Sequence, residues 1–323
     1  MKAALYEKYG EPNVLQLREV QKPAPEDGEV LIRIHAASVN AYDWHFLTAD
    51  IFLIRLMGGG FLRPVDPRLG ADVSGRIEEV GRNVSQFSPG DEVIGMVKGG
   101  FAQYAVASEK ALVLKPANAT FHEAAAMPMA SITALQGLRD EGQISSGQRV
   151  LINGASGGVG TFAVQIAKAF DTEVTAVCST GNMEQASSIG ADHVIDYTRE
   201  DFTRGNKKYD LVFAANGYHS LSSYKRTLAP GGVFVMAGGT RRQIFQSMLL
   251  GPLMSEKNGR KMRGVMAKPS QKDLAFIKHL VENGKVRPVI DRRYSLCEVA
   301  EALRYIGEGH ARGKIVISVI NEE

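Results

Sequence analysis

The feature that most constrains the fold of this chain is a glycine-rich turn near its middle, "NGASGGVG", residues 153–160. A short apolar run, "RVLIN", precedes the turn, and apolar residues recur at helical spacing in "GVGTFAVQIAKAF" after it. Glycines allow a tight turn, and the free N–H groups at the start of the following helix attract a pyrophosphate. The turn therefore predicts dinucleotide binding, and a purely structural glycine turn is the alternative.

Strand and helix signals alternate after this turn. The runs "EVTAVCS", "HVIDY", "YDLVFAA" and "GGVFVMAGG" are typical of buried strands, segments such as "MEQASSIG" are typical of helices, and "KMRGVM" is a candidate sixth strand. This alternation favours an α/β fold with a doubly wound parallel sheet of the Rossmann type. Before about Pro116 the apolar runs are shorter and are broken by turns such as "SPGDEV", which indicates a β-rich domain.

Composition excludes several classes of protein. The 323 residues are enough for two ordinary domains, and a net charge of +3 without a long basic cluster argues against nucleic-acid binding. Two cysteines, Cys178 and Cys297, are too few for a four-thiolate zinc site or a disulfide framework. No apolar run approaches the length of a membrane span, and the first residues lack the apolar core of a signal peptide, so we expect a cytoplasmic protein.

The loop after the second predicted strand bears on the choice of cofactor. An NAD enzyme usually carries a carboxylate there to hold the ribose 2′-OH, but "CSTGN", residues 178–182, has none. Hydroxyl and amide groups can hydrogen-bond a 2′-phosphate, and nothing in the loop repels it. The loop therefore favours NADP(H); the alternative is a solvated loop that has no influence on the cofactor.

Several motifs, in order, resemble the medium-chain dehydrogenase/reductase superfamily over nearly the whole chain: "GDEVIG", "GGFAQYAV", "AAAMPMASITALQGL", "VLINGASGGVG" and "GADHVIDY". "SVNAYDWHF" and "GHARGKIVI" are most similar to its zinc-free quinone oxidoreductase branch, which includes chloroplast-envelope and mitochondrial reticulon-interacting relatives. The short-chain dehydrogenases have a similar glycine turn, but none of the ten tyrosines here begins their Tyr-x-x-x-Lys motif. The resemblance implies a homodimer whose GroES-like β-barrel catalytic domain, residues 1–122 and 268–323, is split by an NADP-binding Rossmann domain, residues 123–267.

The resemblance also bears on zinc. The three positions that supply zinc ligands in alcohol dehydrogenases correspond to Asn40, Ala71 and approximately Met129. A tetrahedral zinc site needs imidazole, thiolate or carboxylate ligands, so we expect no zinc. Without a metal to acidify its hydroxyl, an alcohol is a poor hydride donor. The expected substrate is therefore a small apolar quinone or another conjugated carbonyl compound, although aldehydes stay open.

Site residues carry over from the same resemblance. The catalytic candidates are Asn40, Tyr42 and His45, although Tyr42 could only pack against the cofactor and His45 could cap a helix. The residues expected to contact the cofactor are Asn40, Thr133, Asn153, Gly154, Ser156, Gly157, Gly158, Val159, Gly160, Ser179, Thr180, Asn182, Tyr197, Asn216, Gly238, Gly239, Arg312 and Lys314. Many relatives carry a cation near residue 181 or 182, and here Arg199 or Arg241 would have to supply that charge.

Two apolar stretches, residues 46–62 and 244–254, are candidate walls of a substrate pocket. Ordinary core packing is the alternative for both, and the second could also touch a membrane surface or a partner. Two classes of function follow from the whole sequence. The first is an NADPH-dependent reductase of quinones or enones. The second is an NADPH-binding structural or regulatory protein with little catalysis, as the lens zeta-crystallins of the same branch suggest.

Overall fold

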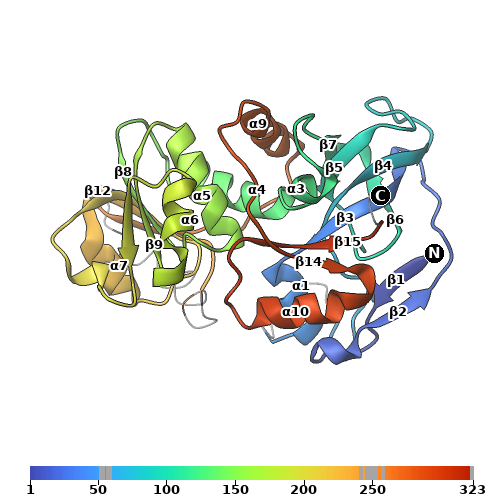
Figure 1. Cartoon of the computed structure of the whole chain (residues 1–323), viewed down its shortest axis with the longest axis horizontal. Helices are drawn as coiled ribbons and strands as arrows, with labels where there is room; N and C mark the ends of the chain where they lie inside the picture. Colours follow the sequence, from blue (N-terminus) through green and yellow to red (C-terminus); the bar gives the residue numbers. More distant parts are fainter. Residues whose placement is uncertain (51–54, 56–59, 240–242, 244–253, 256–258, 321–323) are drawn as a thin grey trace. The chain divides into compact units, whose positions relative to one another are not determined.

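The computed structural model describes residues 1–50, 55, 60–239, 243, 254–255 and 259–320 (Figure 1). The chain forms two compact units. The first contains Met1–Met129, Pro269–Glu282 and Pro288–Glu323, and the second contains Ala130–Lys268 and Asn283–Arg287. The first unit is therefore discontinuous in sequence. No helix among the residues that the structure describes is long and apolar enough to cross a membrane.

A mixed sheet forms the centre of the first unit. Its strand order is β14 (Ile290–Ser295), β15 (Lys314–Ser318), β3 (Glu29–Val39), β4 (Asp72–Val80), β5 (Glu92–Met96) and β7 (Leu112–Leu114), with β6 (Tyr104–Ser108) also paired to β3. β14 and β15 run parallel, and the other pairs are antiparallel. β1 (Lys2–Leu5) and β2 (Gln16–Glu19) form a separate antiparallel pair. The strands are rich in branched apolar residues, and they enclose a large hydrophobic core.

Short helices close the ends of this sheet. They are α1 (Ala41–Thr48), α3 (Phe121–Ala125), α9 (Gln271–Glu282) and α10 (Val299–Gly307), with single turns η1 (Pro12–Val14), η3 (Glu109–Ala111) and η7 (Leu296–Glu298). α1 begins directly after β3, because the backbone N–H of Asn40 at the end of the strand donates to Oδ2 of Asp43 in the first turn of the helix. Trp44 on α1 packs so closely on Gly307 that a Cβ there would lie 2.5 Å from the indole ring. The strand end and α10 therefore hold α1 in place.

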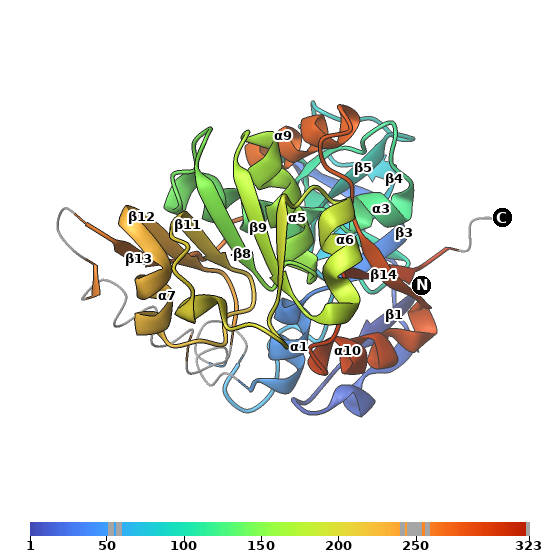
Figure 2. The same cartoon turned by 60° about the vertical axis from the view of Figure 1, so that its left-hand side comes forward.

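The second unit is a parallel sheet in the order β10 (His193–Asp196), β9 (Glu173–Cys178), β8 (Arg149–Asn153), β11 (Tyr209–Ala214), β12 (Leu228–Met236) and β13 (Lys261–Gly264). Figure 2 shows β8, β9, β11 and β12 side by side, with α5 (Gly158–Ala169), α6 (Met183–Ser188) and α7 (Leu221–Thr227) packed along them. α4 (Pro128–Gln136), η4 (Gly137–Glu141), η5 (Thr180–Asn182) and η6 (Phe202–Arg204) complete the elements. The strand order reverses between β8 and β11, and ligands of such sheets bind outside the carboxyl ends of the strands at this point. The prediction of a doubly wound parallel sheet with a sixth strand is confirmed.

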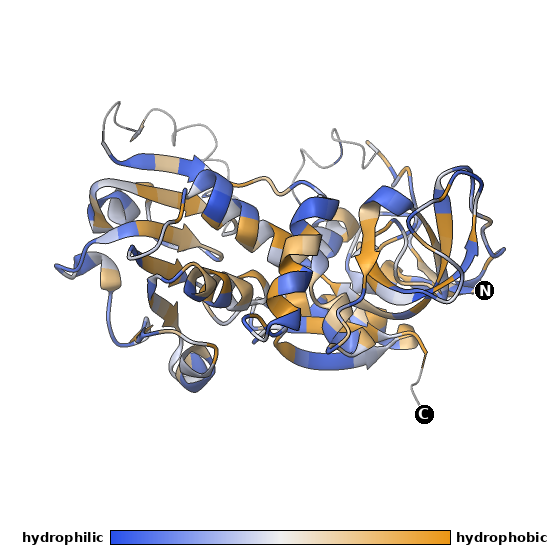
Figure 3. Cartoon of the chain, turned by 90° about the horizontal axis from the view of Figure 1, so that it is seen from above, coloured by the Kyte–Doolittle hydropathy of each residue, from blue (hydrophilic) through white to orange (hydrophobic). Residues whose placement is uncertain are grey.

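The strands of the second unit are buried on both faces. Val150, Leu151 and Ile152 in β8 have no exposed surface, as expected for a central parallel strand that helices cover on both sides. Figure 3 shows hydrophobic residues concentrated along the central strands of this unit, with hydrophilic residues on its helices, loops and outer strand. Because these strands are buried on both faces, they are continuously apolar, and this is why short apolar runs in the sequence predicted them.

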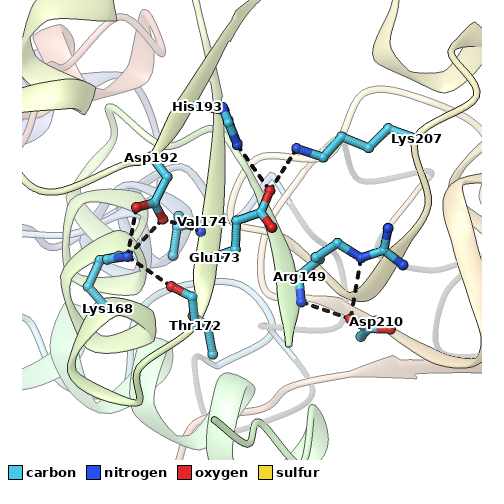
Figure 4. Close-up of polar contacts among 9 residues, drawn as sticks. All are labelled: Arg149, Lys168, Thr172, Glu173, Val174, Asp192, His193, Lys207 and Asp210. Carbon is cyan, nitrogen blue, oxygen red and sulfur yellow. Dashed lines mark hydrogen bonds and ion pairs between the residues drawn. The ribbon is translucent and has the colours of Figure 1, made fainter. Parts of the chain in front are cut away.

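Ion pairs tie together the amino ends of these parallel strands (Figure 4). Oε1 of Glu173, which begins β9, lies 3.0 Å from Nε2 of His193 and 3.0 Å from Nζ of Lys207. The backbone N–H of Arg149 donates to Oδ2 of Asp210 at 2.8 Å, which links β8 to β11. These charged groups pair with one another and so link the amino ends of neighbouring strands.

Candidate cofactor and substrate site

The glycine turn joins β8 to α5. Gly154 has φ +78°, and a Cβ there would lie 2.9 Å from the backbone nitrogen of Asn216; a Cβ on Gly160 would lie 2.0 Å from the Gly154 carbonyl oxygen. Only glycine fits at these two positions. A Cβ on Gly157, in contrast, would meet no atom closer than 3.7 Å, so the N-cap of the twelve-residue helix α5 is open. This open cradle at a helix start fits a pyrophosphate.

Three predicted cofactor residues meet beside the turn. Nδ2 of Asn182 donates to Oγ of Ser156 and to Oγ of Ser179, both at 3.1 Å. Among the residues that the structure describes, neither serine hydroxyl donates to an acceptor, so its hydrogen can be donated to a ligand. Oδ1 of Asn182 is buried and has no hydrogen-bond partner among the residues that the structure describes. The group thus offers two directed hydroxyl donors, which suits phosphate oxygens.

Thr180 differs from its expected role. Its hydroxyl lies 2.5 Å from Oδ2 of Asp196 and donates to that carboxylate, so it is not free for a 2′-phosphate. Asp196 ends β10, where the register pairs it with Cys178 at the end of β9. Sequence reasoning missed Asp196 because it searched for a carboxylate after the second strand only. The strand pairing brings the carboxylate of the third strand to the same loop.

Other predicted cofactor residues gather at the strand switch. Asn153 ends β8, and its Nδ2 donates to the Asn216 carbonyl at 3.0 Å and to the Tyr224 hydroxyl at 2.7 Å. The backbone N–H of Gly238 donates to the Ala214 carbonyl, and Gly239 bridges to Gly217. Asn153, Asn216, Gly238 and Gly239 therefore lie together at the carboxyl ends of β8, β11 and β12. Gly158 and Val159 begin α5, Thr133 lies partly buried on α4, and Tyr197 is exposed directly after β10.

In the first unit, strand register brings Asn40, Asp72 and Lys314 into one buried cluster. Ser38 pairs with Asp72 between β3 and β4, and Val39 pairs with Ile315 between β3 and β15. Lys314 Nζ donates to Oδ1 of Asn40 at 2.5 Å and lies 3.5 Å from Oδ2 of Asp72. Asn40 Nδ2 donates to the same Asp72 oxygen at 3.0 Å.

The hydrogen bonds of this cluster limit what Asn40 can do. Its two amide hydrogens face Oδ2 of Asp72 and the Ser38 carbonyl, the latter at 3.4 Å, and Oδ1 already accepts from Lys314. Asn40 can therefore accept one more hydrogen bond, but it has no N–H left to donate. Lys314 keeps a third ammonium hydrogen. Of these two residues, only Lys314 therefore retains a hydrogen that it can donate.

Burial sets the electrostatics of the cluster. It raises the pKa of Asp72, which Lys314 opposes, and it lowers the pKa of Lys314, which Asp72 opposes, so each charge depends on the other. Burial also raises the pKa of Asp43 to about 7, although the N–H groups of Asn40 and Gly70 donate to its carboxylate at 2.8 and 3.0 Å. Asp43 therefore caps α1 and links it to the backbone at Gly70, just before β4, which is a structural role.

Tyr42 and His45 lie in different surroundings. Tyr42 lines a cavity of about 270 Å³ in the first unit, together with Tyr6, Phe46 and Leu69, and its ring centroid lies 4.3 Å from that of Phe46. Burial raises the pKa of the Tyr42 hydroxyl, which keeps it protonated. His45 does not line this cavity, and its Nδ1 lies 2.7 Å from Oδ1 of Asp50. Tyr42 can therefore contact a ligand in this cavity, whereas His45 does not line it.

Some residues predicted from the sequence are placed neither beside the glycine turn nor in the cluster of Asn40, Asp72 and Lys314. The backbone N–H of Arg312 donates to Oδ2 of Asp291 at 2.8 Å, and the Arg312 side chain is exposed. Most of the apolar stretches 46–62 and 244–254, at residues 51–54, 56–59 and 244–253, lies outside the described residues, as does Arg241. Of the first stretch, Phe46 lines the cavity with Tyr42.

The residues at the positions of the zinc ligands do not fit a zinc ion. Asn40, Ala71 and Met129 offer no thiolate or imidazole, and the ammonium of Lys314 already lies against Asn40 and Asp72. A second cation there would be repelled. Among the described residues, no group of three His, Cys, Asp or Glu side chains could hold a metal ion.

Fold and site define a two-unit nicotinamide oxidoreductase, and comparison with known proteins agrees. Residues 26–117 match the alcohol dehydrogenase GroES-like domain family, and residues 189–317 match a domain family described as zinc-binding dehydrogenase. The chain belongs to the medium-chain dehydrogenase/reductase superfamily and to its zinc-free quinone oxidoreductase-like branch. The predicted GroES-like and Rossmann architecture is thereby confirmed.

Similar individual proteins span almost the whole chain. Quinone-oxidoreductase QR1, chloroplastic, of Triphysaria versicolor is 34% identical over 98% of both chains. Human NAD(P)H oxidoreductase RTN4IP1, mitochondrial, is 33% identical over 99% of this chain and 89% of its own. The 2-methylene-furan-3-one reductase of Solanum lycopersicum is 34% identical over 99% of this chain and 79% of its own. The solved quinone oxidoreductase of Coxiella burnetii superposes with a TM-score of 0.86 at 28% identity, covering 99% of both chains.

Proposed function

We propose that this chain is a zinc-independent oxidoreductase that uses NADPH to reduce a quinone or an α,β-unsaturated carbonyl compound. The observation that carries the proposal is the glycine turn, at which no described residue lies closer than 3.7 Å to a Cβ placed on Gly157, and the Ser156 and Ser179 hydroxyls donate to no described acceptor. The printed names of the relatives, which include quinone oxidoreductases, an NAD(P)H oxidoreductase and a furanone reductase, support the substrate class.

The roles of the residues follow from their contacts. A bound nicotinamide supplies a hydride for a conjugated acceptor, and a proton must reach the acceptor's oxygen. Tyr42, whose protonated hydroxyl lines the 270 Å³ cavity, is our candidate for the proton donor. Lys314 offers a hydrogen bond to a ligand carbonyl, and Asn40 accepts one. The second unit holds the cofactor at the turn, and the first unit supplies the groups that act on the substrate.

The test is NADPH oxidation in the presence of a panel of small quinones and enones. We expect turnover with at least one of the two substrate classes, quinones or enones. Gly157→Asp should abolish this turnover, because the charge and bulk of the new carboxylate oppose binding of the pyrophosphate. The alternative, an NADPH-binding structural protein, predicts tight NADPH binding without turnover on any member of the panel. Absence of both binding and turnover would contradict the oxidoreductase proposal and this alternative alike.

We further propose a homodimer that pairs through β13. Lys261–Gly264 lies at one end of the described sheet order, and an uncovered sheet edge favours association. Light scattering should give twice the chain mass over a wide concentration range, and a stable monomer would contradict the proposal. A cytoplasmic location also stays a prediction; cell fractionation tests it, since two of the relatives are named chloroplastic and mitochondrial.

A further inference from the structure

The carboxylate of Asp196, at the end of β10, is surrounded by donors. Oδ1 accepts from the Thr198 N–H at 3.0 Å and from the Thr198 hydroxyl at 2.7 Å. Oδ2 accepts from the Thr180 hydroxyl at 2.5 Å and lies 3.5 Å from Nε of Arg199. A carboxylate has about four lone-pair sites; three of them accept hydrogen bonds here, and the Arg199 guanidinium lies beside the same carboxylate. Asp196 is therefore less available to a ribose 2′-OH than the acidic residue of an NAD enzyme is.

Arg199 supplies a positive charge that the loop of residues 178–182 lacks. Its Nε approaches the same Asp196 oxygen that the Thr180 hydroxyl contacts, so the guanidinium lies at the Thr180 end of that loop. The Arg199 side chain is 76% exposed, whereas that of Asp196 is 6% exposed. The remaining N–H groups of the guanidinium therefore face solvent while the carboxylate anchors one side of it.

Two exposed tyrosines mark the same edge of the sheet. Tyr197 follows Asp196, and its backbone N–H donates to the Cys178 carbonyl at 3.1 Å, which ties it to the loop. Tyr218 follows β11, and the two ring centroids lie 5.5 Å apart. Both rings are nearly half exposed. Exposed aromatic surfaces of this kind suit a flat heteroaromatic ring such as adenine, next to the cation that would meet its ribose substituent.

We propose that Arg199, anchored by Asp196, recognises the 2′-phosphate of NADPH and sets the preference for NADPH over NADH. The inference rests on the proposed cofactor function. Without Arg199, Asp196 would leave an uncompensated carboxylate beside the loop, which repels the phosphate. Loss of Arg199 therefore removes an attraction and exposes a repulsion, and neither acts on NADH, which has no charge at this position.

The test uses 2′,5′-ADP and 5′-AMP as probes in calorimetric titrations of the full chain. They differ only in the 2′-phosphate, and neither undergoes hydride transfer. We expect Arg199→Ala to weaken 2′,5′-ADP binding by about tenfold to a hundredfold, the range of a charge-assisted hydrogen bond, and to leave 5′-AMP binding within about twofold. Arg199→Lys, which keeps the charge, should retain part of the preference.

A matched control lies five residues further along. Arg204 pairs with Asp201 at the same i, i+3 spacing, with Nε 3.2 Å from Oδ2, and its side chain is 85% exposed. Arg204→Ala should change neither probe. An equal loss in both arginine variants, or an unchanged ratio of the two probes in Arg199→Ala, would overturn the assignment while leaving the cofactor proposal intact. If the unaltered chain binds neither probe nor NADPH, the cofactor proposal itself fails.

Discussion

Replacing Lys314 by methionine tests whether the buried cluster depends on an internal cation. The side chains of Lys314 and Asp72 are 3% and 0% exposed. Lys314→Met keeps most of the side-chain volume but leaves Asp72 charged, with Ser38, Asn40 and the Met129 N–H as its remaining donors among the described residues. Breaking a buried ion pair by removing one partner costs about 3–5 kcal/mol, a large share of the ordinary stability of a protein. We expect a loss of this size in the unfolding free energy of the first unit.

The assay follows urea unfolding through tryptophan fluorescence. Trp44 is the only tryptophan in the sequence and lies on α1 in the first unit, so the signal reports this unit alone. Arg76→Met is the control, because Arg76 and Glu92 form a shorter ion pair of 2.7 Å whose side chains are 52% and 36% exposed. Exposed pairs contribute about 0–1 kcal/mol. Burial, rather than distance, should decide which variant loses more.

The pH dependence and a double variant sharpen the test. In Lys314→Met, burial without a counterion raises the pKa of Asp72 in the folded state above its unfolded value. The loss should therefore be absent below the unfolded pKa of about 4 and should grow as pH rises through the folded pKa. Adding Asp72→Asn should recover about 1–3 kcal/mol relative to the sum of the single losses. Equal losses in Lys314→Met and Arg76→Met, or strict additivity, would refute the reasoning.

Three further predictions concern other parts of the chain. Burial raises the pKa of Asp43 to about 7 beside Asp72 and Lys314, so its contribution to stability is complete at low pH and declines as pH rises from about 4 to about 7, by up to about 4 kcal/mol. Asp43→Asn should therefore make the decline of the unfolding free energy with pH shallower. An identical slope in the variant and the unaltered chain would contradict this prediction. Prolonged chelation with EDTA should leave quinone reduction unchanged, whereas activity lost to EDTA and restored by Zn²⁺ would contradict the zinc-independent proposal. Thr180→Asp, which sets a second carboxylate against Asp196, should lower kcat/KM for NADPH at least tenfold more than for NADH; an unchanged ratio would mean that the loop does not contact the ribose.

Local patterns carried most of the fold prediction. The glycine turn, the helical spacing after it and the short apolar runs depend on neighbours in sequence, and so the parallel sheet and its sixth strand, Lys261–Gly264, could be predicted. The missed residues depend on contacts between strands. Asp72 meets Ser38 and Asn40 through the register of β3 with β4, and Asp196 meets Thr180 through the register of β9 with β10. No periodicity in a single segment contains that information.

Contacts between distant segments also explain why the roles of Asn40 and Thr180 differ from those predicted. Sequence similarity marked Asn40 and Thr180 as groups that bind a ligand, but it could not show that neighbours would use their donors first. Asp72 and the Ser38 carbonyl take both amide hydrogens of Asn40, and Asp196 takes the hydroxyl hydrogen of Thr180. Counting donors and acceptors requires the positions of every neighbour, and these positions follow from the tertiary structure.

The discontinuous first unit has a consequence for the order of folding during synthesis. β3 and β4, which carry Ser38 and Asp72, leave the ribosome before the second unit, whereas β15 with Lys314 leaves after it. The nascent first unit can pair its early strands, but Asp72 has no counterion until the later strand joins β3. The parallel sheet of the second unit, contiguous apart from one short segment, can form in the interval. The first unit is therefore completed last, and a nascent chain that stalls before residue 314 holds a carboxylate that cannot be buried at low cost.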